Sequence, residues 1–203
     1  LDSTVRYPYQ MTLGAIQGND ALIEKMGYQI AQQCKRMGVH INYAPVVDVN
    51  NNPLNPVINF RSFGEDRELV TQKALAYMRG LQKGGIITSA KHFPGHGDTG
   101  VDSHYDIPVL SHSRARLDSL ELYPYKELIN NGLQGVMVGH LNIPSLDSTA
   151  SLASTLSRPI VNGLLREEMK FEGLVFTDAM DMKGATKMFP EGTANVKAFL
   201  AGN

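Results

Sequence analysis

Four short apolar stretches alternate along this chain with longer segments in which apolar residues recur every three or four positions. The longer segments are typical of amphipathic helices, because 3.6 residues per turn bring such positions onto one face. The short stretches are typical of buried strands, and the alternation predicts a parallel sheet with crossover helices. The expected helix and strand pairs are 19–37 with 40–47, 67–82 with 86–90, 113–130 with 136–139, and 158–169 with 173–177.

Polar residues follow each expected strand: Asp48, then Lys91 with His92, then His140, then Asp178. In (β/α)8 barrels the active site is built from the loops after the strands, so this recurrence predicts a TIM-type barrel of the α/β class. Four strands are recognisable where a barrel needs eight. We therefore expect residues 1–203 to form a single barrel domain, incomplete at both ends, from a longer parent chain that leaves room for an appended domain.

Composition narrows the class of protein further. Among 203 residues, 19 Lys and Arg stand against 20 Asp and Glu, which argues against a nucleic-acid partner. No apolar run approaches the roughly 20 residues that cross a bilayer. The localisation stays open, because the sequence does not begin at an initiator methionine.

The single cysteine excludes an internal disulfide and is expected on the apolar face of the first helix. That face is predicted as a stripe of Leu22, Met26, Ile30 and Cys34, widened by Ile23 and Met37.

Residues 91–104, KHFPGHGDTGVDSH, gather most of the candidate chemistry. Asp102 and His104 are two positions apart, so the carboxylate can accept the imidazole N–H and raise the basicity of the ring. This pair suits a general acid/base, although Asp-x-His also occurs as a structural hydrogen bond in turns. Asp178 directly follows a strand, where it is either a nucleophile or the N-cap of the next helix.

The remaining polar residues admit two interpretations each. A guanidinium such as that of Arg61 can hold vicinal hydroxyls or a carboxylate of a ligand, or can pair with Glu65 or Asp66 at a helix start. Asp48 is expected to have a structural role, holding the loop that follows it in place. His140 lines the pocket or is a core histidine bonded to a carbonyl. Zinc has enough donors in His92, His96, Asp98, Asp102 and His104, but Pro94 and the glycines of this segment disfavour a helical zinc motif, and no metal is expected.

Four motifs resemble one known family: NYAPVVDVN, NFRSFGED, KHFPGHGDTGVDSH and FTDAMDMKGA, in this order. They are similar to the glycoside hydrolase family 3 barrel, in its β-N-acetylglucosaminidase branch. The resemblance implies a retaining mechanism without metal or organic cofactor. It makes Asp178 the nucleophile, ahead of Asp181, and His104 the acid/base assisted by Asp102, with Arg61, Lys91 and His92 binding the sugar.

The same resemblance leaves alternatives open. The substrate is expected to be terminal β-linked N-acetylglucosamine on glycans or peptidoglycan fragments. A β-glucosidase of the same family and a catalytically silent sugar-binding barrel are the competing interpretations.

A neutral imidazole base repels an anion less than a carboxylate would, so phosphate can compete with water as the acceptor. The family's D-G-E-type sugar-binding loop has no counterpart in this sequence.

Overall fold

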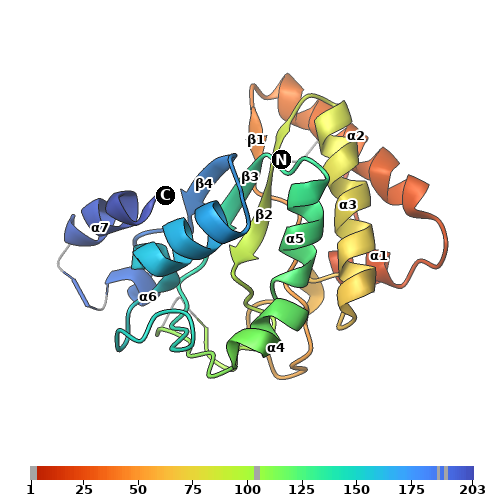
Figure 1. Ribbon diagram of the computed structural model, residues 1–203. Helices are drawn as coiled ribbons and strands as arrows, with labels where there is room; N and C mark the ends of the chain where they lie inside the picture. The colour runs from red at the N-terminus through yellow and green to blue at the C-terminus, as the bar shows by residue number, and fades with distance from the viewer. Residues whose placement is uncertain (1–3, 103–105, 187, 190–191) are drawn as a thin grey trace.

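The computed structural model describes residues 4–102, 106–186, 188–189 and 192–203 (Figure 1). A parallel sheet occupies its centre, with strands in the order β1-β2-β3-β4, so each strand pairs with the one before it in the sequence. The predicted α/β class is confirmed, and this sequential parallel order is that of a (β/α)8-type barrel wall. The strands are β1 (Ile41–Asn42), β2 (Ile87–Phe93), β3 (Gly135–Val138) and β4 (Leu174–Thr177).

Helices connect the strands and cover one side of the sheet. In Figure 1, α2, α3 and α5 lie beside one another against β2. Among the described residues, no helix combines the length and the apolar character that crossing a membrane requires. The helices are α1 (Gln10–Gly14), α2 (Asp20–Arg36), α3 (Arg67–Lys83), α4 (Arg114–Ser119), α5 (Tyr123–Asn130), α6 (Lys183–Thr186) and α7 (Thr193–Ala201), with the 3₁₀ turns η1 (Asn59–Arg61) and η2 (Ser154–Leu156) and the π-helical η3 (Pro159–Glu168).

Two strand boundaries differ from those expected by more than one residue. The first strand, predicted over 40–47, is regular only at Ile41–Asn42, and beyond it an isolated bridge joins Val46 to Lys91. Pro45, between them, has no N–H to donate to a continuous ladder. The second strand does not end at residue 90 but continues to Phe93, so Lys91 and His92 lie on β2 rather than after it. The polar side chains had suggested a loop, yet the backbone continues its pairing with β3.

The helix predicted over 113–130 is two helices, α4 and α5. Leu120 is the C-cap of α4, and Leu122 is the N-cap of α5. Pro124 lies in the first turn of α5, where its missing N–H costs nothing. A helix that continued from α4 would need a backbone N–H at Pro124, which proline lacks. The first helix therefore ends before this residue.

The apolar face of α2 contains most of the predicted stripe. Ile23, Met26 and Cys34 are buried, which confirms the core position of the thiol. Leu22 and Met37 were predicted in the same stripe but are 50% and 47% exposed. A repeat of four residues drifts by about 40° per step around a helix, so Leu22, at the start of the repeat, leaves the buried face. Met37 is the C-cap residue and lies beyond the last turn of α2.

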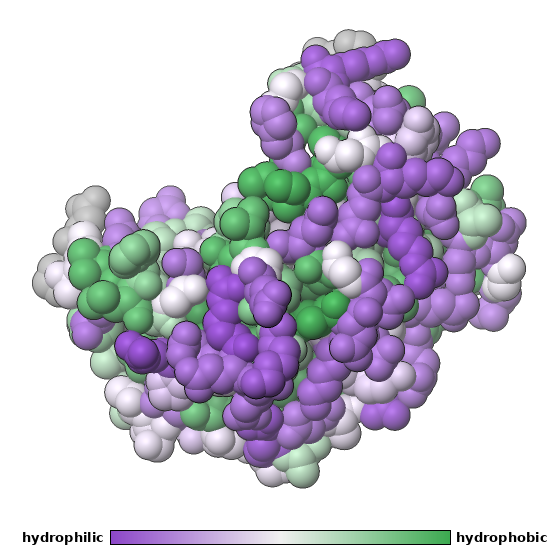
Figure 2. Space-filling view, turned by 45° about the horizontal axis from the view of Figure 1, so that its top comes forward, coloured by the Kyte–Doolittle hydropathy of each residue, from purple (hydrophilic) through white to green (hydrophobic). Residues whose placement is uncertain are grey.

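Apolar side chains also remain uncovered at the far end of the molecule. Val196, Phe199 and Leu200 on α7 are each more than half exposed. Figure 2 shows these apolar side chains gathered over α7, on the left of the view. Such a patch is typical of a surface that meets another segment or chain.

Helices α2 and α3 pack closely because glycines face one another where they meet. A Cβ atom added to Gly27 would lie 2.6 Å from the carbonyl oxygen of Tyr77. A Cβ atom added to Gly80 would collide with the carbonyl oxygen of Glu24 and would lie 2.9 Å from the Cα of Gly27. The backbones can approach this closely only without side chains at these two positions.

We predict that Gly80→Ala lowers the free energy of unfolding by about 1–3 kcal/mol, because the methyl group forces two backbones apart. Gly163→Ala is the matched control, since no heavy atom lies within 4 Å of the added Cβ in η3. Alanine there should leave stability unchanged or raise it by up to about 1 kcal/mol. Urea denaturation measures both changes, and an unaltered midpoint for Gly80→Ala would contradict the packing described.

Candidate active site

The candidate site lies at the carboxyl ends of the strands. Lys91 and His92 come from the end of β2, and Asp178 directly follows β4. Arg61 comes from η1, in the connection between β1 and α3, and Asp48 follows β1. The parallel order of the strands brings these five side chains, far apart in the sequence, to one edge of the sheet.

Asp48 is the most connected of these residues. Its carboxylate is 1% exposed and accepts three hydrogens, from the backbone N–H of His92 at 3.2 Å, from Nδ1 of His92 at 2.7 Å and from the backbone N–H of His96 at 2.7 Å. Burial by itself raises the pKa of Asp48, but the electrostatic interactions and hydrogen bonds with His92 and His96 outweigh it and lower that pKa overall. Asp48 is therefore a buried anion that holds the end of β2.

Asp48 also fastens the loop that follows it, as predicted. The hydroxyl of Ser62 donates to the carbonyl oxygen of Asp48 at 2.6 Å and accepts from the backbone N–H of Gly64 at 3.1 Å. One residue thus joins the loop after β1 to the segment after β2. Asn55, which the sequence did not single out, adds to this junction by donating to the carbonyl oxygens of His96 at 2.7 Å and Gly97 at 3.0 Å.

His92 occupies an irregular position of β2. Lys91 pairs with Met137 and Phe93 with Val138, so the ladder skips His92. A bulge of this kind re-aims a side chain. The peptide bonds Lys91–His92 and Phe93–Pro94 on either side are cis. The imidazole is almost fully buried, with Nδ1 on Asp48 and Nε2 3.3 Å from Nη2 of Arg61.

Arg61 is held on the site rather than at the start of α3. Its Nη1 donates to the carbonyl oxygen of Val57 at 3.3 Å, and its Nη2 contacts His92. Asp66, an alternative partner considered above, instead accepts the backbone N–H of Leu69 at 2.7 Å as the N-cap of α3. The guanidinium therefore faces the same edge of the sheet as Lys91.

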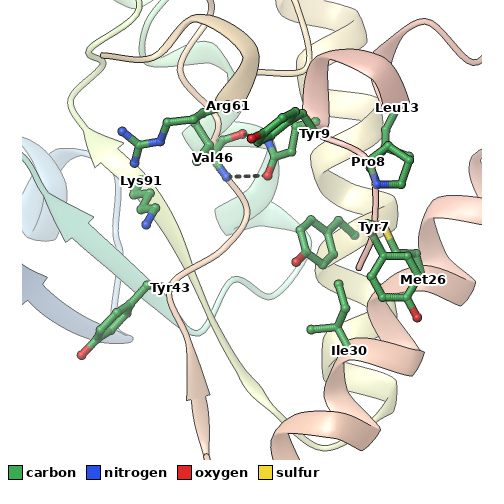
Figure 3. A pocket seen from close by; sticks show the side chains of 12 residues that line it. Tyr7, Pro8, Tyr9, Leu13, Met26, Ile30, Tyr43, Val46, Arg61 and Lys91 are labelled. Atoms are coloured by element: carbon green, nitrogen blue, oxygen red, sulfur yellow. Dashed lines mark hydrogen bonds between the residues drawn. The ribbon is translucent and has the colours of Figure 1, made fainter. Parts of the chain in front are cut away.

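Arg61 and Lys91 line a pocket of about 260 Å³ (Figure 3). Burial lowers the pKa of Lys91, the charge of Arg61 lowers it further, and the carboxylates of Asp178 and Asp48 partly offset both effects. In Figure 3 the two cationic side chains lie together at one end of the pocket, while Tyr7 and Ile30 lie at the other. The pocket thus offers hydrogen-bond donors beside apolar and aromatic walls.

Asp178 is partly exposed at the end of β4. Its backbone N–H donates to the carbonyl oxygen of Val138 at 2.9 Å, and its Oδ1 accepts the backbone N–H of Ala179 at 2.8 Å. The next helix, α6, begins only at Lys183, so Asp178 is not its N-cap. Asp181, the alternative nucleophile, is exposed.

The predicted acid/base pair is only partly described. The carbonyl oxygen of Asp102 accepts the backbone N–H of Asp106 at 3.2 Å. His104 lies outside the described residues, so the assignment of an Asp102–His104 dyad stays a prediction.

Two other histidines are buried and contact neighbouring protein groups. His96 is buried, with Nδ1 2.6 Å from the hydroxyl of Thr99, and burial lowers its pKa to about 4. His140 is fully buried between the hydroxyl of Thr155, at 2.7 Å from Nδ1, and the carbonyl oxygen of Ala179, at 2.9 Å from Nε2. Of the two interpretations of His140, the core histidine bonded to a carbonyl is the one observed.

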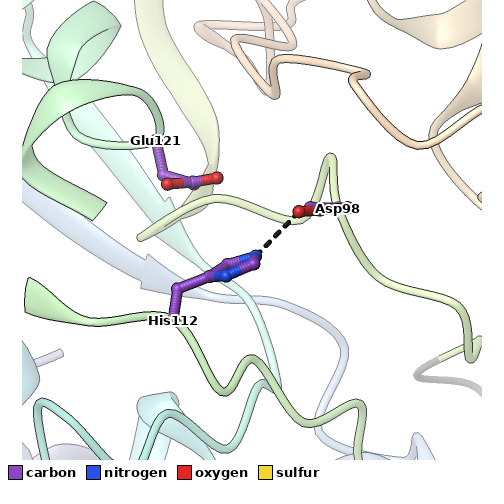
Figure 4. Close-up of side chains that lie close together, drawn as sticks. All are labelled: Asp98, His112 and Glu121. Atoms are coloured by element: carbon purple, nitrogen blue, oxygen red, sulfur yellow. Dashed lines mark hydrogen bonds and ion pairs between the residues drawn. The ribbon is translucent and has the colours of Figure 1, made fainter. Parts of the chain in front are cut away.

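Within the described residues, one cluster of side chains has the donors of a metal site (Figure 4). Asp98, His112 and Glu121 have ligand atoms within 4.8 Å of one another. Nε2 of His112 lies 2.7 Å from Oδ2 of Asp98. Nη1 of Arg116, however, donates to both carboxylate oxygens of Glu121 at 2.7 Å, and its Nη2 lies 3.6 Å from Asp98. A metal ion would have to compete with this guanidinium, which already supplies the positive charge.

The fold and the site define a parallel α/β protein with polar side chains gathered at the carboxyl ends of its strands, two of which, Arg61 and Lys91, line a pocket. The chain belongs to glycosyl hydrolase family 3, because the model of the glycosyl hydrolase family 3 N terminal domain matches residues 1–203. The β-hexosaminidase A of Pseudoalteromonas piscicida is 37% identical over 95% of this chain and 34% of its own length.

Solved structures agree with this membership. A glycoside hydrolase family 3 β-N-acetylglucosaminidase from Paenibacillus sp. str. FPU-7 is 41% identical, with a TM-score of 0.91 over 95% of this chain and 36% of its own. A β-glucoside phosphorylase is 30% identical, with a TM-score of 0.92 over 96% of this chain and 36% of its own. The chain thus spans about a third of the length of these relatives.

The buried His96 predicts a dependence of stability on pH. The unfolded chain binds a proton near pH 6.5, whereas the folded protein binds it only near pH 4. The contribution of neutral His96, about 3 kcal/mol, is therefore fully present above pH 6.5 and is lost as the pH falls to 4.

Measurement of the free energy of unfolding between pH 7 and pH 4 should show this slope in the wild type. His96→Gln should flatten it, because glutamine does not titrate. The matched control is His40→Gln, at an exposed histidine, which should keep the slope. A slope that survives in His96→Gln would show that another group causes it.

Proposed function

We propose that the full-length protein is a retaining β-N-acetylglucosaminidase that removes terminal β-linked N-acetylglucosamine from glycans or peptidoglycan fragments. Residues 1–203 would form one barrel domain of that protein. The observation that supports this most is the position of Asp178, which directly follows β4 at the edge of the sheet where Lys91 ends β2, and whose carboxylate acts to raise the pKa of Lys91. An anion at the same edge as two cationic donors suits the attack on a sugar whose hydroxyls those donors hold.

In the proposed mechanism, Asp178 attacks the anomeric carbon while His104 gives its proton to the departing glycosidic oxygen. The glycosyl–aspartate ester is then hydrolysed by a water molecule, which loses a proton to the neutral imidazole of His104. Asp102 would orient this ring through its N–H. The balance closes with no metal and no organic cofactor, since the imidazole regains the proton that it gave.

The substrate preference of the proposal comes from relatives. The names β-hexosaminidase and β-N-acetylglucosaminidase of two similar proteins favour an N-acetylated amino sugar over glucose. Arg61 and Lys91 would donate hydrogen bonds to the hydroxyls of this sugar, with His92 beside them. Contacts with its remaining hydroxyls would come from elsewhere in the full-length protein, since residues 1–203 correspond to only 34% and 36% of the length of these two relatives.

A second candidate reaction is phosphorolysis. It is favoured by one observation, the likeness to a β-glucoside phosphorylase at 30% identity. The proposed base is a neutral imidazole, so an incoming phosphate would meet no opposing carboxylate at that position. Phosphate oxygen would then replace water oxygen in the attack on the glycosyl–aspartate ester.

We predict that Asp178→Asn lowers kcat for an aryl N-acetyl-β-glucosaminide by about 10³-fold or more, roughly 4 kcal/mol of transition-state stabilisation. The amide cannot act as the nucleophile. Asp181→Asn is the matched control at an exposed carboxylate three residues away and should retain nearly full activity. Release of the aryl group measures both variants in the full-length protein.

The comparison of substrates separates the alternatives. Faster release from the aryl β-glucoside would favour a β-glucosidase. Absence of turnover with either glycoside, together with retained binding of N-acetylglucosamine, would favour a sugar-binding barrel. Retained activity in Asp178→Asn would remove this residue as nucleophile.

The choice of acceptor is predicted separately. If phosphate competes with water, N-acetylglucosamine 1-phosphate should appear beside the free sugar and should increase with phosphate concentration. Mass spectrometry of the products measures the ratio. Free sugar alone at high phosphate, with chloride as the control salt, would exclude phosphorolysis.

A further inference from the structure

Three described side chains form a continuous chain of contacts behind the pocket. Oδ2 of Asp48 lies 2.7 Å from Nδ1 of His92, and Nε2 of His92 lies 3.3 Å from Nη2 of Arg61. Asp48 is 1% exposed, and the side chain of His92 is 5% exposed. Water therefore does not substitute for either contact.

The direction of each hydrogen bond follows from the chemistry of its ends. Arg61 carries only donors, so Nε2 of His92 must accept. An ionised carboxylate carries only acceptors, so Nδ1 of His92 must donate to Asp48. Both conditions hold only for a neutral imidazole with its proton on Nδ1. Because the tautomer of a histidine is set by the bond that its other nitrogen makes, Asp48 decides what His92 presents to Arg61.

We infer that Asp48 is a positioning residue, which fixes the Nδ1–H tautomer of His92 and through it holds the guanidinium of Arg61 in place for the sugar. This inference rests on the proposed function for the identity of the ligand. It adds a role for His92, both of whose ring nitrogens have protein partners. His92 orients Arg61, which with Lys91 would contact the sugar directly.

The fixed guanidinium would be an advantage for binding. Nη1 on the carbonyl oxygen of Val57 and Nη2 on His92 secure the two ends of the planar fork. The other N–H groups of the same rigid plane keep a constant direction, so less side-chain entropy is lost when a ligand binds. The pocket that Arg61 lines with Lys91 would receive these donors.

Asp48→Asn tests this arrangement because it changes the charge and one donor while keeping the shape. The amide oxygen would take the Oδ1 position, where it still accepts the backbone N–H of His96. The amide nitrogen would then face Nδ1 of His92 as a donor, and the imidazole would move its proton to Nε2. Two N–H donors, from His92 and Arg61, would oppose each other, so the guanidinium would lose its position.

The first measurement is ¹⁵N NMR of histidine-labelled full-length protein. The wild type should show His92 with a protonated Nδ1 and an unprotonated Nε2, and Asp48→Asn should reverse this. The second measurement is calorimetric binding of N-acetylglucosamine. Asp48→Asn should weaken it about 10-fold or more, and KM for the aryl glycoside should rise more than kcat falls.

A double-mutant cycle shows whether the effect passes through Arg61. Arg61→Ala should weaken sugar binding strongly in the wild type and by less than 3-fold in Asp48→Asn, because the guanidinium is already displaced there. The matched control is Asp147→Asn, since Asp147 accepts from the backbone N–H of Thr149 and the hydroxyl of Ser157 away from the pocket. This variant should leave sugar binding unchanged.

Several results would overturn the inference. These are an Nε2–H tautomer of His92 in the wild type, unchanged sugar affinity in Asp48→Asn, or multiplicative effects of Asp48→Asn and Arg61→Ala. If Asp48→Asn does not fold, His92→Met replaces it in the cycle, with the same expected loss of the Arg61 effect. Failure of the proposed function looks different: no glycoside is turned over, while the tautomer and the coupling in sugar binding remain.

Discussion

One buried carboxylate ties the candidate site together. Asp48 follows β1, yet its three hydrogen bonds all come from the end of β2 and the loop directly after it. Removing a carboxylate from water is costly unless its oxygens are paired, so Asp48 is stable there only while this segment keeps its conformation. The bulge at His92, the placement of Arg61 and the path of the chain to His96 all depend on that mutual requirement.

The sheet supplies the second constraint. Parallel strands in sequential order place successive carboxyl ends side by side, so residues from four separate parts of the sequence converge without long connections. The helices that return the chain must pack closely to permit this order, and α2 and α3 do so through Gly27 and Gly80. The pocket therefore depends on these two glycines, which lie far from it, as well as on the polar residues that line it.

Periodicity predicted the parts of the fold in which local and tertiary preferences agree. The helices α2 and α3 fall within a residue or two of their expected ends, because their helical periodicity agrees with their packing. The end of β2 was missed because Lys91 and His92 are polar, although a strand that ends in a site must contain such residues. The break between α4 and α5 was visible only as Pro124.

The candidate site was predictable in its members but not in its connections. Strand ends indicated Asp48, Lys91, His92 and Asp178, because polarity after an apolar run can be read directly from the sequence. Which nitrogen of His92 faces which partner depends on contacts between residues 31 and 44 positions apart, and no local pattern records them. Asn55 was missed for the same reason, since its partners lie more than 40 positions away.

The ends of β2 and β4 are each secured by residues that close the strand before them. Asp48 after β1 holds the end of β2, and Val138 and His140 at and after the end of β3 hold Asp178 and Ala179 after β4. These contacts therefore link one βα unit to the next along the chain. A βα unit exchanged between relatives would keep its geometry only if the residues that follow the preceding strand were exchanged with it. A module for recombination in this domain should therefore begin at the end of the preceding strand rather than at the start of its own.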